Sequence, residues 1–226
     1  MFVPAPYRQP SAPWMADILR GGPLALMVSN GPREADPYAT HLPVVQDPAT
    51  AHERWPADLA GARLLGHMNR ANPHWKALRD GARVLLVFTG PHAYVSPTVY
   101  GQTPSAPTWD FTSVHVHGVL HRIEPQEAGE QTLEVVRSTV RALEGDFGDG
   151  WDMSDSQDYF RKILPAVGGF RVEVSTAEGM FKLSQEQDPH VRERVRDSFA
   201  RSDSTRHRDT ARLMGRLPAP GCPHSA

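Results

Sequence analysis

Polar side chains gather in four short segments, each of which follows or lies beside an apolar run. The segments are His67–Pro73, Gly90–Pro97, Pro107–Phe111 and Phe181–Gln185. In the first segment, a turn between a strand and a helix is expected to display His67, Asn69, Arg70 and Asn72 together. Backbone N–H groups at a helix start and a guanidinium suit an anionic cofactor group such as a phosphate or a propionate. The alternative is a capped turn, in which Asn72 serves the helix and Arg70 is solvated.

Histidine is abundant, since the chain has 11 His against one Cys. His115, His117 and His121 share one face of an expected strand at a spacing of two residues. Three histidines can hold zinc, but this extended spacing makes convergence on one small ion awkward. The usual role of a half-buried strand histidine is a hydrogen-bonded core residue. His67 differs because it follows Gly66 at a strand end, where a single axial ligand could project into a cleft.

A carboxylate stands between two aromatic residues in the third segment, Trp109-Asp110-Phe111. A carboxylate in an apolar wall either contacts a cation or has a raised pKa. The alternative is an aspartate that caps the turn after Pro107. Lys182 in the fourth segment would add a cationic contact to such a site, or else be a solvated loop residue.

The apolar pattern indicates a turn-rich α+β fold. Apolar runs bounded by Gly, Pro and Asn predict strands over 24–29, 38–45, 62–65, 83–89, 114–121 and 170–174. Helical spacing predicts helices over 14–20, 132–147 and 156–164, with a helical turn over 73–78 that Asn72 caps. Gly90-Pro91 is expected to end its strand. Short strands at hairpin spacing, followed by helices, favour an antiparallel barrel over a parallel sheet.

The composition changes after Gln185, which predicts two regions. Residues 1–187 would form the barrel domain, and residues 188–226 a charged C-terminal extension that is partly helical, with one polar helix over 189–199, or disordered. The role of Cys222 in that extension stays open.

Composition excludes several classes of protein. One Cys in 226 residues rules out a disulfide framework and Cys-rich metal sites. A formal net charge of −2 argues against nucleic acid as a partner. No apolar stretch is long enough to predict a membrane span, and the expected compartment is the cytoplasm. Phosphate-binding glycine loops, the His-Glu-x-x-His zinc motif and the Gly-x-Ser-x-Gly elbow are all missing from the sequence.

The segments, in this order, resemble the PaiB family of FMN-binding split-barrel proteins, often described as negative transcriptional regulators. The matching motifs are Met-Phe-Val-Pro-x-Pro-Tyr at residues 1–7, His-Met-x-Arg-Ala-Asn-Pro at 67–73, Gly-Pro-x-Ala-Tyr-Val-Ser-Pro at 90–97, Pro-Thr-Trp at 107–109 and Lys-Leu-Ser-Gln at 182–185. The resemblance implies an antiparallel split β-barrel with flanking helices, and a homodimer whose cofactor site lies near the subunit interface.

The sequence departs from that pattern at several positions. The family usually has Ala at Asn69, Trp at Val99, Asn-Tyr at Asp110-Phe111 and Asn at Glu186. Val99 removes an aromatic wall, and Asp110 adds a negative charge. With these residues the sequence resembles the piperazate synthases, PaiB-like enzymes that hold haem b. They close N5-hydroxy-L-ornithine to L-piperazic acid, forming an N–N bond with net loss of water, in nonribosomal peptide biosynthesis.

This second resemblance implies roles for individual residues. His67 is the expected axial ligand of the haem iron, with His115 or His117 as alternatives. Cationic side chains would pair the propionates, assisted by polar neighbours; the residues are Arg70, Lys182, Asn69, Asn72 and Ser96. Asp110 would hold the amine end of the substrate, and Asp110 or Tyr94 would move protons.

Two other functions remain open from the sequence. An FMN-binding regulator of the PaiB type would carry flavin and associate with DNA. The Arg-rich C-terminal segment is the feature of the sequence that favours this function. A haem-degrading or haem-storing split-barrel protein would not react with hydroxyornithine. The oxidation state of the iron and the natural-product pathway are not encoded in any motif.

Overall fold

The computed structural model describes the chain except residues 12, 32–35, 51–54, 56–57, 124–127 and 218–226. Its residues group into two compact units. The first unit contains Met1–Gly21, Thr89–Val114 and Glu178–Ala226, and the second contains Gly22–Phe88 and His115–Ala177. Residue 187 lies inside the first unit. The division into a barrel domain of residues 1–187 and an extension of residues 188–226 stays a prediction.

Six antiparallel strands close into a barrel in the order β1-β2-β3-β6-β5-β4. The strands are β1 (Leu24–Ser29), β2 (Tyr38–Gln46), β3 (Arg63–Asn69), β4 (Ala82–Val95), β5 (Thr108–Arg122) and β6 (Val167–Lys182). The predicted α+β class with an antiparallel split barrel and flanking helices is confirmed.

Alternating burial explains why these segments are strands. In β5, Val114, Val116 and Leu120 are fully buried, whereas His115 and His117 between them are half-buried. Between β3 and β6, Gly66 lets the Phe170 ring lie against the backbone, since a Cβ at Gly66 would come within 2.8 Å of the Phe170 ring. The barrel interior of the second unit is therefore filled by side chains.

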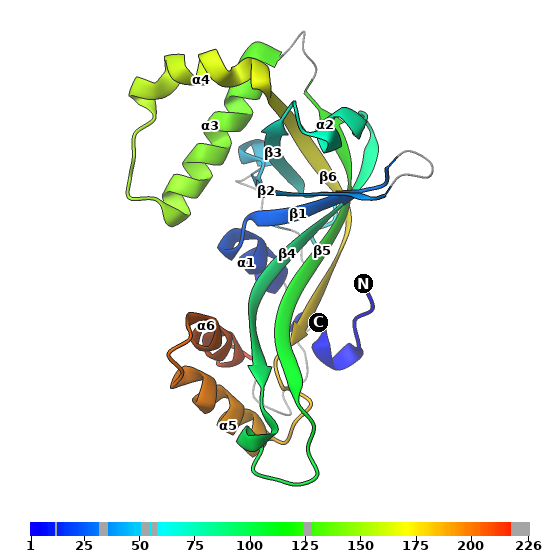
Figure 1. Cartoon of the computed structure of the whole chain (residues 1–226), viewed down its shortest axis with the longest axis vertical. Coiled ribbons are helices and arrows are strands. Elements are labelled where there is room, and N and C mark those ends of the chain that lie inside the picture. Colours follow the sequence, from blue (N-terminus) through cyan, green and yellow to red (C-terminus); the bar gives the residue numbers. More distant parts are fainter. Residues whose placement is uncertain (12, 32–35, 51–54, 56–57, 124–127, 218–226) are drawn as a thin grey trace. The chain divides into compact units, whose positions relative to one another are not determined.

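Helices flank the strands in both units. They are α1 (Pro13–Gly21), α2 (Pro73–Ala77), α3 (Ala128–Phe147), α4 (Gln157–Ile163), α5 (Pro189–Ala200) and α6 (Thr205–Met214). In the second unit α3 lies along β2 and β3, where Val135 joins a buried cluster with Val45, Leu65 and Ile123 (Figure 1). The predicted helix over 189–199 is confirmed as α5, which packs against α6 in the first unit; α6 was not predicted.

Four strands run well beyond their predicted ranges: β3, β4, β5 and β6. Gly90-Pro91 does not end β4, which runs on to Val95. Gly90 has no side chain to collide with Ile18, whose Cδ1 would lie 2.6 Å from a Cβ there. Pro91 still contributes its carbonyl, which accepts a 3.1 Å hydrogen bond from the Thr112 hydroxyl. β5 likewise starts at Thr108, and β6 extends to Lys182.

In the described part of the chain, no helix has both the length and the apolar character needed to cross a membrane.

Candidate functional site

His67 lies in β3 rather than in a turn. The predicted strand ended at residue 65, but pairing with β6 continues to Asn69, and His67 stands opposite Gly169. The imidazole is half-buried, and its Nδ1 is a buried atom without a hydrogen-bond partner among the described residues. Burial lowers the pKa of His67, so the ring is neutral at pH 7. A neutral imidazole with an unused nitrogen has the chemistry of a metal ligand.

The polar residues after His67 mostly serve the backbone. Asn72 caps α2 through a 2.9 Å bond from the His74 N–H to its Oδ1, so the predicted cap is confirmed. Asn69 accepts the Ala71 N–H in the same way at 2.7 Å. Arg70 donates from Nε to the Val167 carbonyl at 3.0 Å, and its two terminal nitrogens have no partner among the described residues. Arg70 is therefore the cation of this group that has donors left for an anion.

A buried histidine that the sequence analysis did not single out lies beside this group. His74 is 1% exposed and is bonded through both ring nitrogens, to the hydroxyls of Ser29 and Thr40, at 2.9 Å each. It stacks on Tyr38 with ring centroids 5.3 Å apart. With both nitrogens occupied, His74 is a structural residue. Asn72-Pro73 marked the start of the helix that carries His74. No sequence signal indicated that His74 would bond to hydroxyl groups on two strands.

His115 and His117 occupy the outward face of β5. Within the described residues no group of three His, Cys, Asp or Glu side chains is placed to hold a metal ion. Both histidines remain alternatives to His67 only as single ligands.

Asp110 is fully buried in the first unit and is not a turn cap. Because side chains alternate along β5, the rings of Trp109 and Phe111 face away from the Asp110 carboxyl instead of enclosing it. The carboxyl accepts two hydrogen bonds from Ser184, one from its N–H at 3.1 Å and one from its hydroxyl at 2.7 Å. Burial raises the pKa of Asp110 to about 7; the bonds from Ser184 oppose this increase.

Charged and phenolic groups surround this carboxyl, and we call them the Asp110 cluster: Tyr7, Tyr100, Asp110, Lys182, Ser184 and Glu186. Glu186 raises the pKa of Asp110, and Lys182 lowers it. The Lys182 ammonium donates to the Thr108 hydroxyl and lies 6.0 Å from the centre of the Tyr7 ring. Burial, followed by the nearby carboxylates, raises the pKa of both phenols.

Tyr94 and Ser96 are placed differently from Asp110. Tyr94 is 46% exposed and packs against Trp109 at 5.9 Å between ring centroids. Ser96 caps the short 3-10 turn Pro97–Val99 by accepting the Thr98 N–H. Within the described residues no hydrogen bond joins either side chain to Asp110. The structure thus brings Asp110 and Lys182 into one cluster, and leaves Tyr94 on an exposed aromatic surface with Trp109 and His92.

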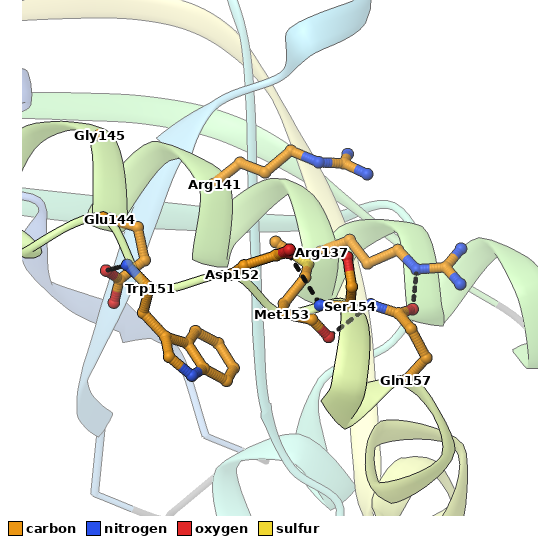
Figure 2. A pocket seen from close by; sticks show the side chains of 10 residues that line it. Arg137, Arg141, Glu144, Gly145, Trp151, Asp152, Met153, Ser154 and Gln157 are labelled. Atoms are coloured by element: carbon orange, nitrogen blue, oxygen red, sulfur yellow. Dashed lines mark hydrogen bonds between the residues drawn. The ribbon is translucent and has the colours of Figure 1, made fainter.

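A pocket of about 710 Å³ lies in the second unit between α3 and the segment that leads into α4 (Figure 2). None of the predicted site residues lines it. Arg137 is bonded to Gln157 and Glu130 at 2.7 and 3.0 Å, and Arg141 to Glu134 at 3.0 Å. Since acids already neutralise its cations, this pocket is a poor site for an anionic cofactor.

The predicted site residues therefore form two groups. His67, Asn69, Arg70 and Asn72 belong to the second unit, and Tyr94, Ser96, Asp110 and Lys182 belong to the first.

A closed antiparallel barrel with flanking helices places the chain in the class of split-barrel proteins. Two solved structures share this fold. One is the FAD and heme binding protein of Mycobacterium smegmatis, with a TM-score of 0.56 and 15% identity, over 82% of this chain and 78% of that chain. The other is a conserved hypothetical protein of Mycobacterium tuberculosis, with a TM-score of 0.54 and 14% identity, over 83% and 94%.

Sequence comparison gives the family. The model described as "Putative FMN-binding domain" matches residues 1–176, and the chain belongs to this family. Among relatives, it is 23% identical over 214 residues to the protease synthase and sporulation protein PAI 2 of Bacillus subtilis, covering 95% of this chain and 96% of that protein. It is 27% identical over 236 residues to an uncharacterized Aspergillus fumigatus protein, covering 88% and 90%.

Proposed function

We propose that this protein is a haem-dependent cyclase that converts N5-hydroxy-L-ornithine into L-piperazic acid. The observation that carries the proposal is the buried Asp110 carboxyl, whose pKa of about 7 lets it both take and give a proton at neutral pH. A protein that only bound flavin would need no such group. The usual family residue at this position, according to the resemblance, is Asn, which cannot titrate.

The residues of the second unit fit a haem. His67 offers a neutral imidazole with an unused buried nitrogen, and the terminal nitrogens of Arg70 are available for a propionate. Lys182, in the Asp110 cluster of the first unit, is the candidate for the substrate carboxylate. When bound, the haem would supply an iron centre that polarises the N–O bond of the hydroxylamine.

The net reaction breaks one N–O bond, forms one N–N bond and releases water, so no external reductant is required. The α-amine attacks N5 as hydroxide leaves, and the proton that the α-ammonium gives up must be accepted. Asp110 is assigned this proton, and the proton returns with the departing oxygen as water. Holding the two nitrogens at about 3 Å would be a large part of the catalysis.

The alternative is an FMN-binding regulator of the PaiB type. It is favoured by the family model and by the similarity to the Bacillus subtilis protein. The two functions differ in the absorption spectrum of the purified protein. A Soret band, together with formation of piperazic acid from hydroxyornithine measured by mass spectrometry, would support the cyclase. Flavin bands, with no turnover after hemin is added, would overturn it in favour of the regulator.

We also propose that the protein is a homodimer. In the second unit, Leu26 and Val28 of β1 pair with Val87 and Leu85 of β4, and all four side chains are half-buried on the outward face of the sheet. A second copy is a suitable cover for this apolar stripe. Light scattering should give twice the 25.0 kDa chain mass. Leu85→Asp should give the single mass, and a single mass for the unmodified protein would contradict the proposal.

A further inference from the structure

The turn after β6 holds a serine in an uncommon backbone conformation. Ser184 is fully buried with φ +57°, in the left-handed region that few residues other than glycine adopt. Bonds inside the turn hold it there: the Gln187 N–H donates to the Ser184 carbonyl at 3.1 Å, and the Leu183 N–H donates to the Gln185 Oε1 at 2.6 Å. Such a conformation persists only where the surroundings determine it.

This conformation directs both donors of one residue at one carboxyl. The Ser184 N–H bonds Asp110 Oδ1 at 3.1 Å, and the Ser184 hydroxyl bonds Asp110 Oδ2 at 2.7 Å. Among the described residues, no other side chain or backbone group bonds Asp110. A carboxylate has about four lone-pair sites, so these two bonds leave one site on each oxygen.

We propose that Ser184 is a positioning residue, which holds the Asp110 carboxyl in the orientation and ionisation state that proton transfer requires. The inference rests on the proposed function and deepens it. The other groups that act on Asp110 are Glu186, which opposes its ionisation, and Lys182, which favours it. The phenols of Tyr7 and Tyr100 also face the cluster. Ser184 differs from all four because it contacts both carboxyl oxygens directly.

Two substitutions separate this role from a contribution to folding. Ser184→Gly and Ser184→Ala both remove the hydroxyl, but glycine adopts φ +57° freely whereas alanine does not. The Ala variant should therefore be the less stable of the two. In both variants the titration midpoint of Asp110 should rise by about one pH unit, because a donor to the charged form is lost. The midpoint is read by ¹³C NMR of the aspartate carboxyls, with Asp110→Asn identifying the resonance.

A matched control exists in the chain. Ser154 also donates its N–H and hydroxyl to one aspartate, Asp152, at 2.9 and 2.8 Å, but on the surface. Ser154→Ala should leave the Asp110 titration unchanged.

The pH profile of turnover tests the role in the reaction. The acidic limb of kcat/KM for hydroxyornithine should move upward with the NMR midpoint in Ser184→Gly, a loss of about tenfold per unit on that limb. A folded Ser184→Gly variant with an unchanged midpoint would overturn the inference, as would a shifted midpoint with an unshifted profile. If the midpoint shifts but the unmodified protein has no turnover, the proposed function fails, while the control of Asp110 by Ser184 is supported.

Discussion

Replacing Asp110 by asparagine should remove a large part of the pH dependence of stability. The pKa of this carboxyl is raised from 3.8 to about 7 in the folded protein. Each pKa unit corresponds to about 1.4 kcal/mol, so the shift of about three units corresponds to about 4 kcal/mol. The side chain is fully buried, so solvent screening does not reduce this figure much.

The sign follows from linkage. Because the folded pKa lies above the unfolded pKa, the carboxyl favours the folded state fully below about pH 4, and this contribution is lost as the pH rises through 7. The asparagine of the variant cannot ionise, although its amide oxygen can still accept a bond from Ser184. The difference in unfolding free energy between the unmodified protein and Asp110→Asn should therefore fall by about 4 kcal/mol between pH 4 and pH 8.

Urea unfolding at several pH values measures this difference. Asp155 is exposed, and Asp155→Asn controls for the removal of one negative charge. A difference between the unmodified protein and Asp110→Asn that stays constant within about 1 kcal/mol from pH 4 to pH 8 would refute the reasoning.

Three further substitutions test other parts of the structure. His67→Ala should lose the haem or shift its Soret band, with the exposed His121→Ala as the control; a normal spectrum and full activity of His67→Ala would move the ligand assignment to His115 or His117. Asn72→Ala should lower the unfolding free energy by about 1 kcal/mol in urea, because the cap of α2 is lost, and an unchanged midpoint would contradict this. Gly90→Ala should cost about 1–3 kcal/mol by the same assay, since its Cβ would collide with the Thr112 hydroxyl and with Ile18; stability equal to the parent would show that the backbone of β4 moves to make room.

The class of fold could be predicted because local patterns carry it. The β1–β2 hairpin and the cap at Asn72 depend on residues close together in sequence, and both were confirmed. The ends of the long strands could not be predicted in the same way. Gly90-Pro91 is locally typical of a strand end, but the contact of Gly90 with Ile18 and the bond from Thr112 come from distant segments.

The candidate site shows the same division. The unusual carboxyl at Asp110 was visible in the sequence, but its expected orientation was wrong, because adjacent strand residues face opposite sides. Its partner Ser184 is 74 residues away, and no spacing rule connects the two. A resemblance supplied the residue types of the site, whereas only the structure showed which of them bond to each other.

The separation of Lys182 from Asp110 explains how this carboxyl can titrate near neutrality. Within the described residues the two side chains form no salt bridge, and the Lys182 ammonium is bonded to the Thr108 hydroxyl instead. A direct ion pair would hold the pKa of Asp110 well below 7 and keep it permanently ionised. With the ammonium bonded to Thr108, burial controls the pKa of Asp110, and the Lys182 charge is available to an anionic group. Proton transfer and anion binding can therefore be assigned to neighbouring side chains of the same cluster.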